Sequence, residues 1–209
     1  MSDRVSRHAP RERAEPRIAR LRTALARRRD LSTREQQIYA RIAEEEGVDR
    51  KDPESTAFAG ILRDTLRDAQ RRNPSLRGFH GPSALTDDAI ITVYKDYFDE
   101  IMQSVGGSRA IDEIDSDCAA AALMDTLFRH GRGDGATLLQ QAIADTWFDA
   151  FPDSTPPLIA SGFGPATFGA FHALVRSGYG AQLTRALANR RTSHRESERS
   201  RYDRFVCSE

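Results

Sequence analysis

The sequence predicts an all-α fold. In several stretches of the 209-residue chain, apolar residues recur every three or four positions, and segments rich in Gly, Pro and Ser separate these stretches. Helix-capping residues precede several of them, whereas no run of alternating β-branched residues indicates a strand. With 39% hydrophobic and 30% charged residues, the chain is polar but has enough apolar side chains for a folded core.

The first thirty residues form a basic segment that holds ten arginines and four acidic residues, a local charge of about +6. Ile18, Leu21 and Leu25 lie at helical spacing within it. We interpret residues 1–31 as an Arg-rich N-terminal arm or docking helix, with a nucleic-acid-binding arm as the alternative. The whole chain has 31 basic and 31 acidic residues, and a formal net charge of zero does not favour nucleic acid as a partner.

The folded body is expected to begin at Ser32, because Ser32 and Glu35 have the spacing of a capping box and a helical pattern follows to Gly47. A second helix is predicted from Thr56 to Arg71, before Asn73-Pro74, and residues 75–84 are predicted to be a loop. A third helix, capped by Thr86, ends at Gly106-Gly107. Its apolar face carries Ile90, Val93, Tyr94, Tyr97, Phe98 and Ile101.

The second half of the chain is also predicted to be helical. One helix is capped by Asp117, another covers residues 136–148, and Gly164-Pro165 opens a third that Gly178 closes. A final Arg-rich helix is expected over residues 179–205. Asp125 lies on an apolar helix face, which favours a buried acid with ion-pair partners over a catalytic one.

Composition and motifs exclude several classes of protein. No stretch of 18 uncharged apolar residues could span a membrane, and no signal peptide is visible at the N-terminus. Cys118 and Cys207 are too few for a disulfide framework or a thiolate zinc site, and both are expected to be free thiols. The five histidines show no metal-ligand spacing, and no phosphate-binding glycine loop occurs, so no metal and no cofactor is expected.

The densest group of carboxylates, residues 44–52, lies where the first predicted helix of the body gives way to a loop. A carboxyl group at such a boundary can be partly buried yet open to a substrate, which suits it to protonating a leaving oxygen. A run of glutamates is more commonly a solvated face. Chemistry at this position therefore needs support from other parts of the chain.

That support comes from ordered motifs. Glu46-Gly47 is followed by Asp52-Pro53, and Tyr94-Lys95-Asp96-Tyr97-Phe98-Asp99 comes later. The stretch from Ala122 to Gly131, then Leu139-Gln140-Gln141-Ala142, then the residues from Gly164 to Phe168 complete the set. Together, over about residues 38–205, they resemble the phage endolysin and secretion-activator N-acetylmuramidases, glycoside hydrolase family 108, with their C-terminal peptidoglycan-binding part.

The resemblance implies a lysozyme-like catalytic lobe at residues 32–112 and a peptidoglycan-binding helical lobe at residues 113–209. It implies that Glu46 is the catalytic acid that cleaves peptidoglycan glycan strands. Because glycosidases use a pair of carboxylates, a second acid is expected, with Asp52 as the candidate and Asp49 less favoured. Asp49, Tyr94 and Tyr97 are the candidate substrate-binding residues.

The chain also departs from the family pattern. Val48 and Asp49 replace the second Gly and the Tyr of the family's Glu-Gly-Gly-Tyr, and the Gly-Gly-x-Thr stretch after Asp-Pro is missing. Arg129 stands where the family has an Asn. These departures leave a rival hypothesis open, a catalytically inactive muramidase-like structural or adaptor protein that docks through its basic termini.

The expected location follows from the function. A chain made in the cytoplasm without a signal peptide would reach the cell wall or periplasm by release, by export through a secretion system, or as part of a virion.

Overall fold

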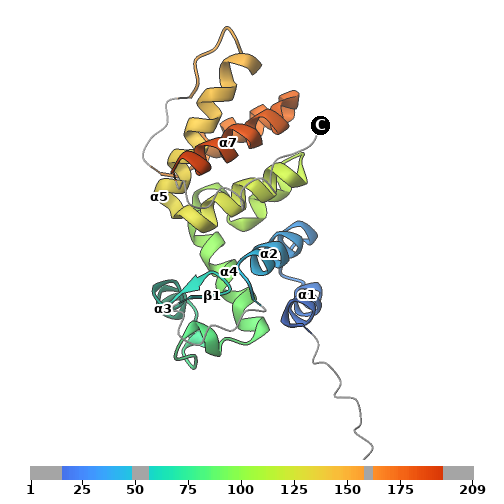
Figure 1. Ribbon diagram of the computed structural model, residues 1–209, viewed down its shortest axis with the longest axis vertical. Helices are drawn as coiled ribbons and strands as arrows, with labels where there is room; N and C mark the ends of the chain where they lie inside the picture. Colours follow the sequence, from blue (N-terminus) through green and yellow to red (C-terminus); the bar gives the residue numbers. More distant parts are fainter. Residues whose placement is uncertain (1–15, 49–56, 158–161, 195–209) are drawn as a thin grey trace, which may run out of the picture.

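The computed structural model describes residues 16–48, 57–157 and 162–194. Within these ranges lie seven α-helices and one two-stranded antiparallel sheet, so the predicted all-α class is confirmed. The first half of the chain, blue to green, forms the lower part of the molecule in Figure 1, and the second half, yellow to red, forms the upper part.

Helix α1 (Arg17–Arg27) belongs to the folded body. Its apolar stripe buries Leu21 and Leu25 completely or nearly so, and the helix packs against α2 (Thr33–Glu45) and α4 (Asp87–Ile101). Basic side chains of α1 pair with acids of the body, since Arg17 Nε lies 2.8 Å from Asp87 Oδ1. The part of the predicted arm that is described is thus a packed helix, and residues 1–15 lie outside the described ranges.

Helix α2 begins as the sequence predicts. The Ser32 hydroxyl accepts a hydrogen bond from the Glu35 backbone N–H at 3.2 Å, and the Glu35 carboxylate accepts one from the Ser32 N–H at 2.6 Å. This reciprocal pair satisfies two backbone donors that the first helical turn would otherwise leave without partners.

The segment from Thr56 to Arg71, predicted to be one helix, is helical only in its second part. Strands β1 (Ala57–Phe58) and β2 (Ile61–Leu62) form a small hairpin, and α3 (Arg63–Arg72) starts only after it. The turn residues Ala59 and Gly60 both have positive φ, which two-residue hairpin turns of type I′ require and a helix excludes. The prediction was wrong here because Phe58, Ile61 and Leu62 also fit helical spacing, so the periodicity did not reveal the turn.

Helix α4 ends at Ile101 and is followed by 3-10 turns at Gln103–Val105 and Ser108–Glu113. The predicted loop before α4 holds similar short turns at Pro74–Leu76 and Pro82–Ala84. Aromatic rings from α2, α4 and α5 (Asp117–Ala150) pack in edge-to-face, stacked or tilted pairs in the centre of the lower half. They belong to Tyr39, Tyr94, Tyr97, Phe98 and Phe128.

Helix α5 is a pair of helices joined at Gly131, whose φ of 68° and ψ of −174° are not helical. The two helices predicted for this stretch are therefore present, with the break at Gly131. Cys118, near the start of α5, is bonded in a disulfide, so the expected free thiol is wrong at this position. Cys207 lies outside the described residues.

Helices α6 (Pro165–Leu174) and α7 (Gly180–His194) complete the upper half, and both pack on α5. A π-helical turn, Val175–Tyr179, joins them, and Gly178, which the sequence predicts to close the helix, has a non-helical φ of 85° in this turn. The final helix predicted over residues 179–205 is described as far as His194.

Candidate functional site

The candidate site lies where α2 ends. Glu46 is the residue that caps the helix, and Gly47 follows in the left-handed conformation with φ of 75°. The Glu46 N–H donates to the Ile42 carbonyl at 2.9 Å, and the Val48 N–H reaches back to the Ala43 carbonyl at 2.9 Å. Glycine is the residue that commonly terminates helices in this way, so the Glu46-Gly47 pair itself sets the backbone of Glu46.

The hairpin turn forms one wall of the site. The Tyr94 hydroxyl donates a hydrogen bond of 2.6 Å to the Ala59 carbonyl oxygen and thereby ties the turn to α4. A Cβ atom at Gly60 would lie 2.8 Å from Glu46 Cγ and 2.6 Å from the Phe128 ring. Only glycine fits between these two side chains with this backbone conformation, and the turn is in close contact with Glu46.

Arg129 of α5 contacts three carboxylates at once. Its Nη1 lies 2.6 Å from Glu46 Oε1, its Nη2 lies 3.2 Å from Glu45 Oε2, and its Nε lies 2.7 Å from Asp125 Oδ1. The side chain of Glu46 is 19% exposed, whereas that of Arg129 is only 7% exposed. The carboxylate of the candidate acid is therefore open to solvent on one side and paired with a nearly buried guanidinium on the other.

The ion pairs continue into the upper half of the molecule. Arg191 of α7 places Nη1 3.0 Å from Asp125 Oδ2 and donates from the same nitrogen to the Thr126 hydroxyl at 2.8 Å. Asp125 and Arg191 are both buried. The prediction of Asp125 as a core acid with ion-pair partners is confirmed, and those partners are two arginines.

These contacts shift the ionisation of the groups around Glu46. Burial favours the neutral form of Arg129, but the carboxylates of Asp125, Glu46 and Glu45 outweigh it and raise the pKa of the guanidinium above its ordinary value. Burial, and secondarily the negative charge of Glu46, raises the pKa of Tyr94 well above its ordinary value. Tyr94 is therefore a neutral hydrogen-bond donor beside an acidic group.

The other predicted site residues have different positions. Tyr94 is fully buried, so its side chain supports the hairpin turn and has no surface to offer a substrate. Tyr97 is partly buried, and its hydroxyl donates to the Leu127 carbonyl at 3.1 Å. Asp49 and Asp52 lie outside the described residues. The structure thus brings together Glu46 and Tyr94 from the predicted set, and adds Arg129, Gly60 and Arg191.

One of the ion pairs that the sequence analysis did not predict is indicated by residue spacing. Asp125 and Arg129 are four residues apart, the spacing at which side chains of one helix meet, so their ion pair could have been predicted. The contacts of Arg129 with Glu46 and of Arg191 with Asp125 join residues 83 and 66 positions apart, respectively. No local pattern indicates such pairs.

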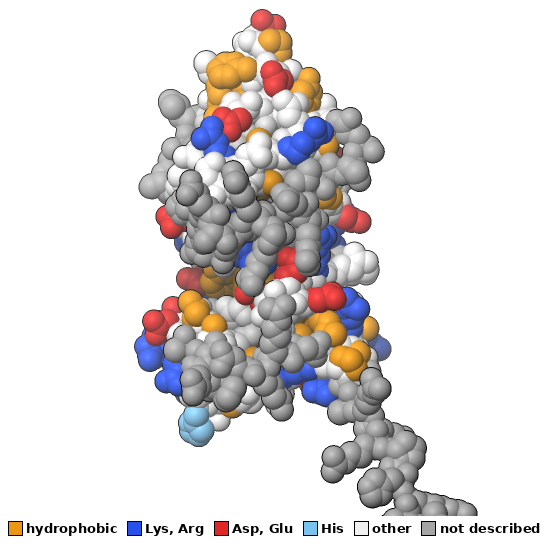
Figure 2. Space-filling model, viewed as in Figure 1, with side chains coloured by type: hydrophobic (Ala, Val, Ile, Leu, Met, Phe, Trp, Pro, Cys, Tyr) orange, Lys and Arg blue, Asp and Glu red, His pale blue; other side chains and the backbone are white. Residues whose placement is uncertain are grey.

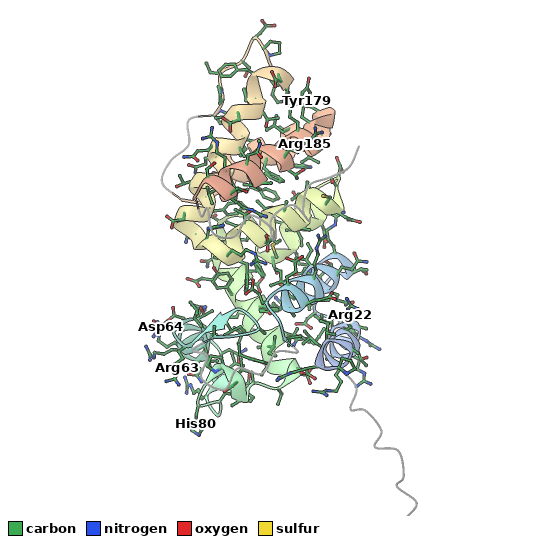
Figure 3. All side chains as sticks on the ribbon, in the orientation of Figure 1. Arg22, Arg63, Asp64, His80, Tyr179 and Arg185 are labelled. Atoms are coloured by element: carbon green, nitrogen blue, oxygen red, sulfur yellow. The ribbon has the colours of Figure 1, made fainter. Side chains whose placement is uncertain are left out.

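A groove of about 630 Å³ lies between α1 and α2. Leu25, Ala26 and Ala40 contribute its apolar lining, and Glu44 and Glu45 lie among its charged residues. Arg22, labelled in Figure 3, pairs with Glu44 at 2.7 Å. Glu46 does not line this groove, although its neighbour Glu45 does.

The described residues hold no group of three or more His, Cys, Asp or Glu side chains that could bind a metal ion. In the same ranges, no helix has the length and apolar character needed to cross a membrane. On the face seen in Figure 2, basic and acidic side chains are interspersed over both halves of the molecule.

Comparison of the chain with models of known protein families finds no match, and neither curated proteins nor solved structures match it significantly.

Proposed function

We propose that the protein is a peptidoglycan glycan-strand hydrolase of the N-acetylmuramidase type, in which Glu46 protonates the glycosidic oxygen. The observation that carries the proposal is the position of Glu46. Its carboxylate lies at the end of a helix, in contact with a hairpin turn and close to a buried tyrosine, with 19% of the side chain exposed. A carboxyl group at such a boundary can meet a bound sugar and still be held by the protein.

The reaction needs a second carboxylate, which activates water or stabilises the positive charge that develops on the sugar. Asp125 is unsuited to this role because it is buried and paired with Arg129 and Arg191. Asp52 is the proposed partner, because the segment that carries it connects Glu46 to the hairpin beside it.

The proposed place of action is the cell wall or periplasm, reached by release, export or delivery with a virion. The disulfide at Cys118 supports this location, because disulfides form and persist in oxidising compartments and are rare in the cytosol. The proposed binding partner is the glycan strand of peptidoglycan.

The test compares muropeptide release from purified peptidoglycan by the wild-type protein and by Glu46→Gln. The substitution preserves size but removes the proton donor, so release should fall by at least about a hundredfold. Glu44→Gln is the matched control, because Glu44 is an exposed neighbour that pairs with Arg22. Release at the same level from wild type and Glu46→Gln would refute the proposal.

A specific observation favours a second candidate, a catalytically inactive muramidase-like adaptor protein. Arg129 replaces the Asn of the family pattern and lies 2.6 Å from Glu46. Its positive charge favours the ionised carboxylate, whereas a general acid must carry a proton. Co-sedimentation with peptidoglycan without any muropeptide release, over pH 4–8, would support this candidate over the hydrolase.

A further inference from the structure

Four charged side chains form a continuous chain of contacts across three helices. It runs from Glu46 at the end of α2 to Arg129 and Asp125 on α5 and then to Arg191 on α7. The three successive contacts measure 2.6, 2.7 and 3.0 Å. Buried charges are costly unless they are paired, so each member requires its neighbours.

Arg129 occupies the central place in this chain. A guanidinium is planar and presents its N–H donors in a fixed fork, and here separate edges face Asp125, Glu45 and Glu46. Because Asp125 holds Nε, the plane of the guanidinium is set from inside the protein. The position of the Glu46 carboxylate is then set by Nη1 on one side and by the turn at Gly60 on the other.

We propose that Arg129 is the positioning residue of the site, which holds the Glu46 carboxylate in place as an anion, and that Asp125 and Arg191 hold Arg129 in turn. Its consequence for catalysis rests on the proposed hydrolase function. Through Arg191 on α7, the upper half of the molecule thus helps to hold the Glu46 carboxylate of the lower half in place.

The consequence concerns the pH dependence of the reaction. Within the described residues, the charged or titratable groups that face Glu46 are Arg129 and Asp125 from α5, Glu45 from α2 and Tyr94 from α4. The hairpin residues 57–62 carry no charge. Among these described groups, Arg129 carries the positive charge that contacts Glu46, and this charge opposes the protonation that a general acid needs. Hydrolysis should therefore increase as the pH falls below neutrality.

The first experiment measures muropeptide release against pH for the wild type, Arg129→Gln and Arg129→Lys. Arg129→Gln removes the charge, so the pH at which release is half-maximal should rise by about one unit or more. Arg129→Lys keeps the charge but loses the guanidinium fork, so its half-maximal pH should stay near that of the wild type while its maximal release falls. An Arg129→Gln profile that coincides with the wild-type profile would overturn the proposal.

The second experiment does not depend on activity. The side-chain Nε–H of Arg129, nearly buried and bonded to Asp125, should give a slowly exchanging NMR signal in the full-length protein. Glu46→Gln should displace this signal, whereas Glu44→Gln should leave it in place. If Glu46→Gln leaves the signal unchanged, the contact does not hold Glu46 and the inference fails. Absence of muropeptide release at every pH, together with a displaced signal, would reject the hydrolase function alone.

Discussion

Gly60 is the residue whose identity the candidate site restricts most tightly. It combines a positive φ of 71° with a position where a Cβ atom would overlap Phe128 and the side chain of Glu46. Either condition alone favours glycine, and together they exclude larger residues unless the turn moves. The sequence contains this glycine, but only the structure explains it.

Gly60→Ala should therefore lower the free energy of unfolding by about 1–3 kcal/mol, measured by urea denaturation. It should also displace Glu46 and reduce any muropeptide release. The control is Gly169→Ala, in an exposed position of α6 where a Cβ atom meets nothing within 4 Å. That control should be neutral or stabilising by about 0.5–1 kcal/mol, and equal losses in both variants would contradict the steric argument.

Asp125 shows how far one residue can be interpreted from sequence. Its place on an apolar helix face predicts burial, and burial predicts partners, because an unpaired buried carboxylate is too costly. Both inferences hold. The identity of Arg191 as a partner could not be predicted, because it lies 66 residues away on another helix and depends on how α5 and α7 pack.

Among the elements, α1 differs most from its expected role. Its arginines predict a basic arm, yet its leucines are buried. Arg17 packs on the body of the protein, with its guanidinium 4.6 Å from the centre of the Phe58 ring. A helix needs few apolar residues to pack along one edge of a body, and three at helical spacing were enough here. A docking surface that uses α1 would have to use its exposed face.

Leu21→Ala tests whether α1 belongs to the folded body in solution. Because Leu21 is fully buried, its truncation should lower the free energy of unfolding by about 2–5 kcal/mol, measured by urea denaturation. The control is Leu62→Ala, since Leu62 is 53% exposed and its truncation should change stability by less than about 1 kcal/mol. A Leu21→Ala variant as stable as the wild type would mean that α1 is an independent arm.

The hairpin of β1 and β2 is the element that the sequence did not reveal. Each strand has only two residues, too short for an alternating pattern, and the same apolar residues also match a helix. The Tyr94 hydroxyl bond to Ala59 and the close packing of Gly60 stabilise the turn. Tertiary contacts thus override local periodicity at the place where the hairpin forms a wall of the candidate site.

At the scale of the whole molecule, ion pairs make stability depend on pH. The hydrogen bond from Arg28 lowers the pKa of Asp30 to about 2 from an ordinary value of 3.8. Burial by itself would raise the pKa of Asp99, but hydrogen bonds from Lys95 and Ser108 lower it. A carboxyl group whose pKa is lower in the folded state stabilises the fold when ionised, and this contribution disappears as the pH falls.

The protein should therefore be less stable at pH 2 than at pH 5, with the loss from Asp30 falling between about pH 4 and pH 2. Melting temperatures measured across this range should show the decline. Asp30→Asn should make the decline smaller, whereas Asp64→Asn should not, because the Asp64 side chain is 83% exposed. An Asp30→Asn variant with the wild-type pH dependence would show that the Arg28–Asp30 pair contributes nothing.

The sequence by itself determined the helical class, the capping box of α2, the interruption of the helix at Gly178 and the position of Glu46 at a helix end. These features depend on residues within a few positions of one another, where periodicity and capping chemistry act. The tertiary structure decided the hairpin turn, the packing of α1 and the contacts of Arg129 and Arg191. They depend on side chains that are distant in sequence and meet only when the helices pack, so the charge environment of Glu46 is a property of the fold.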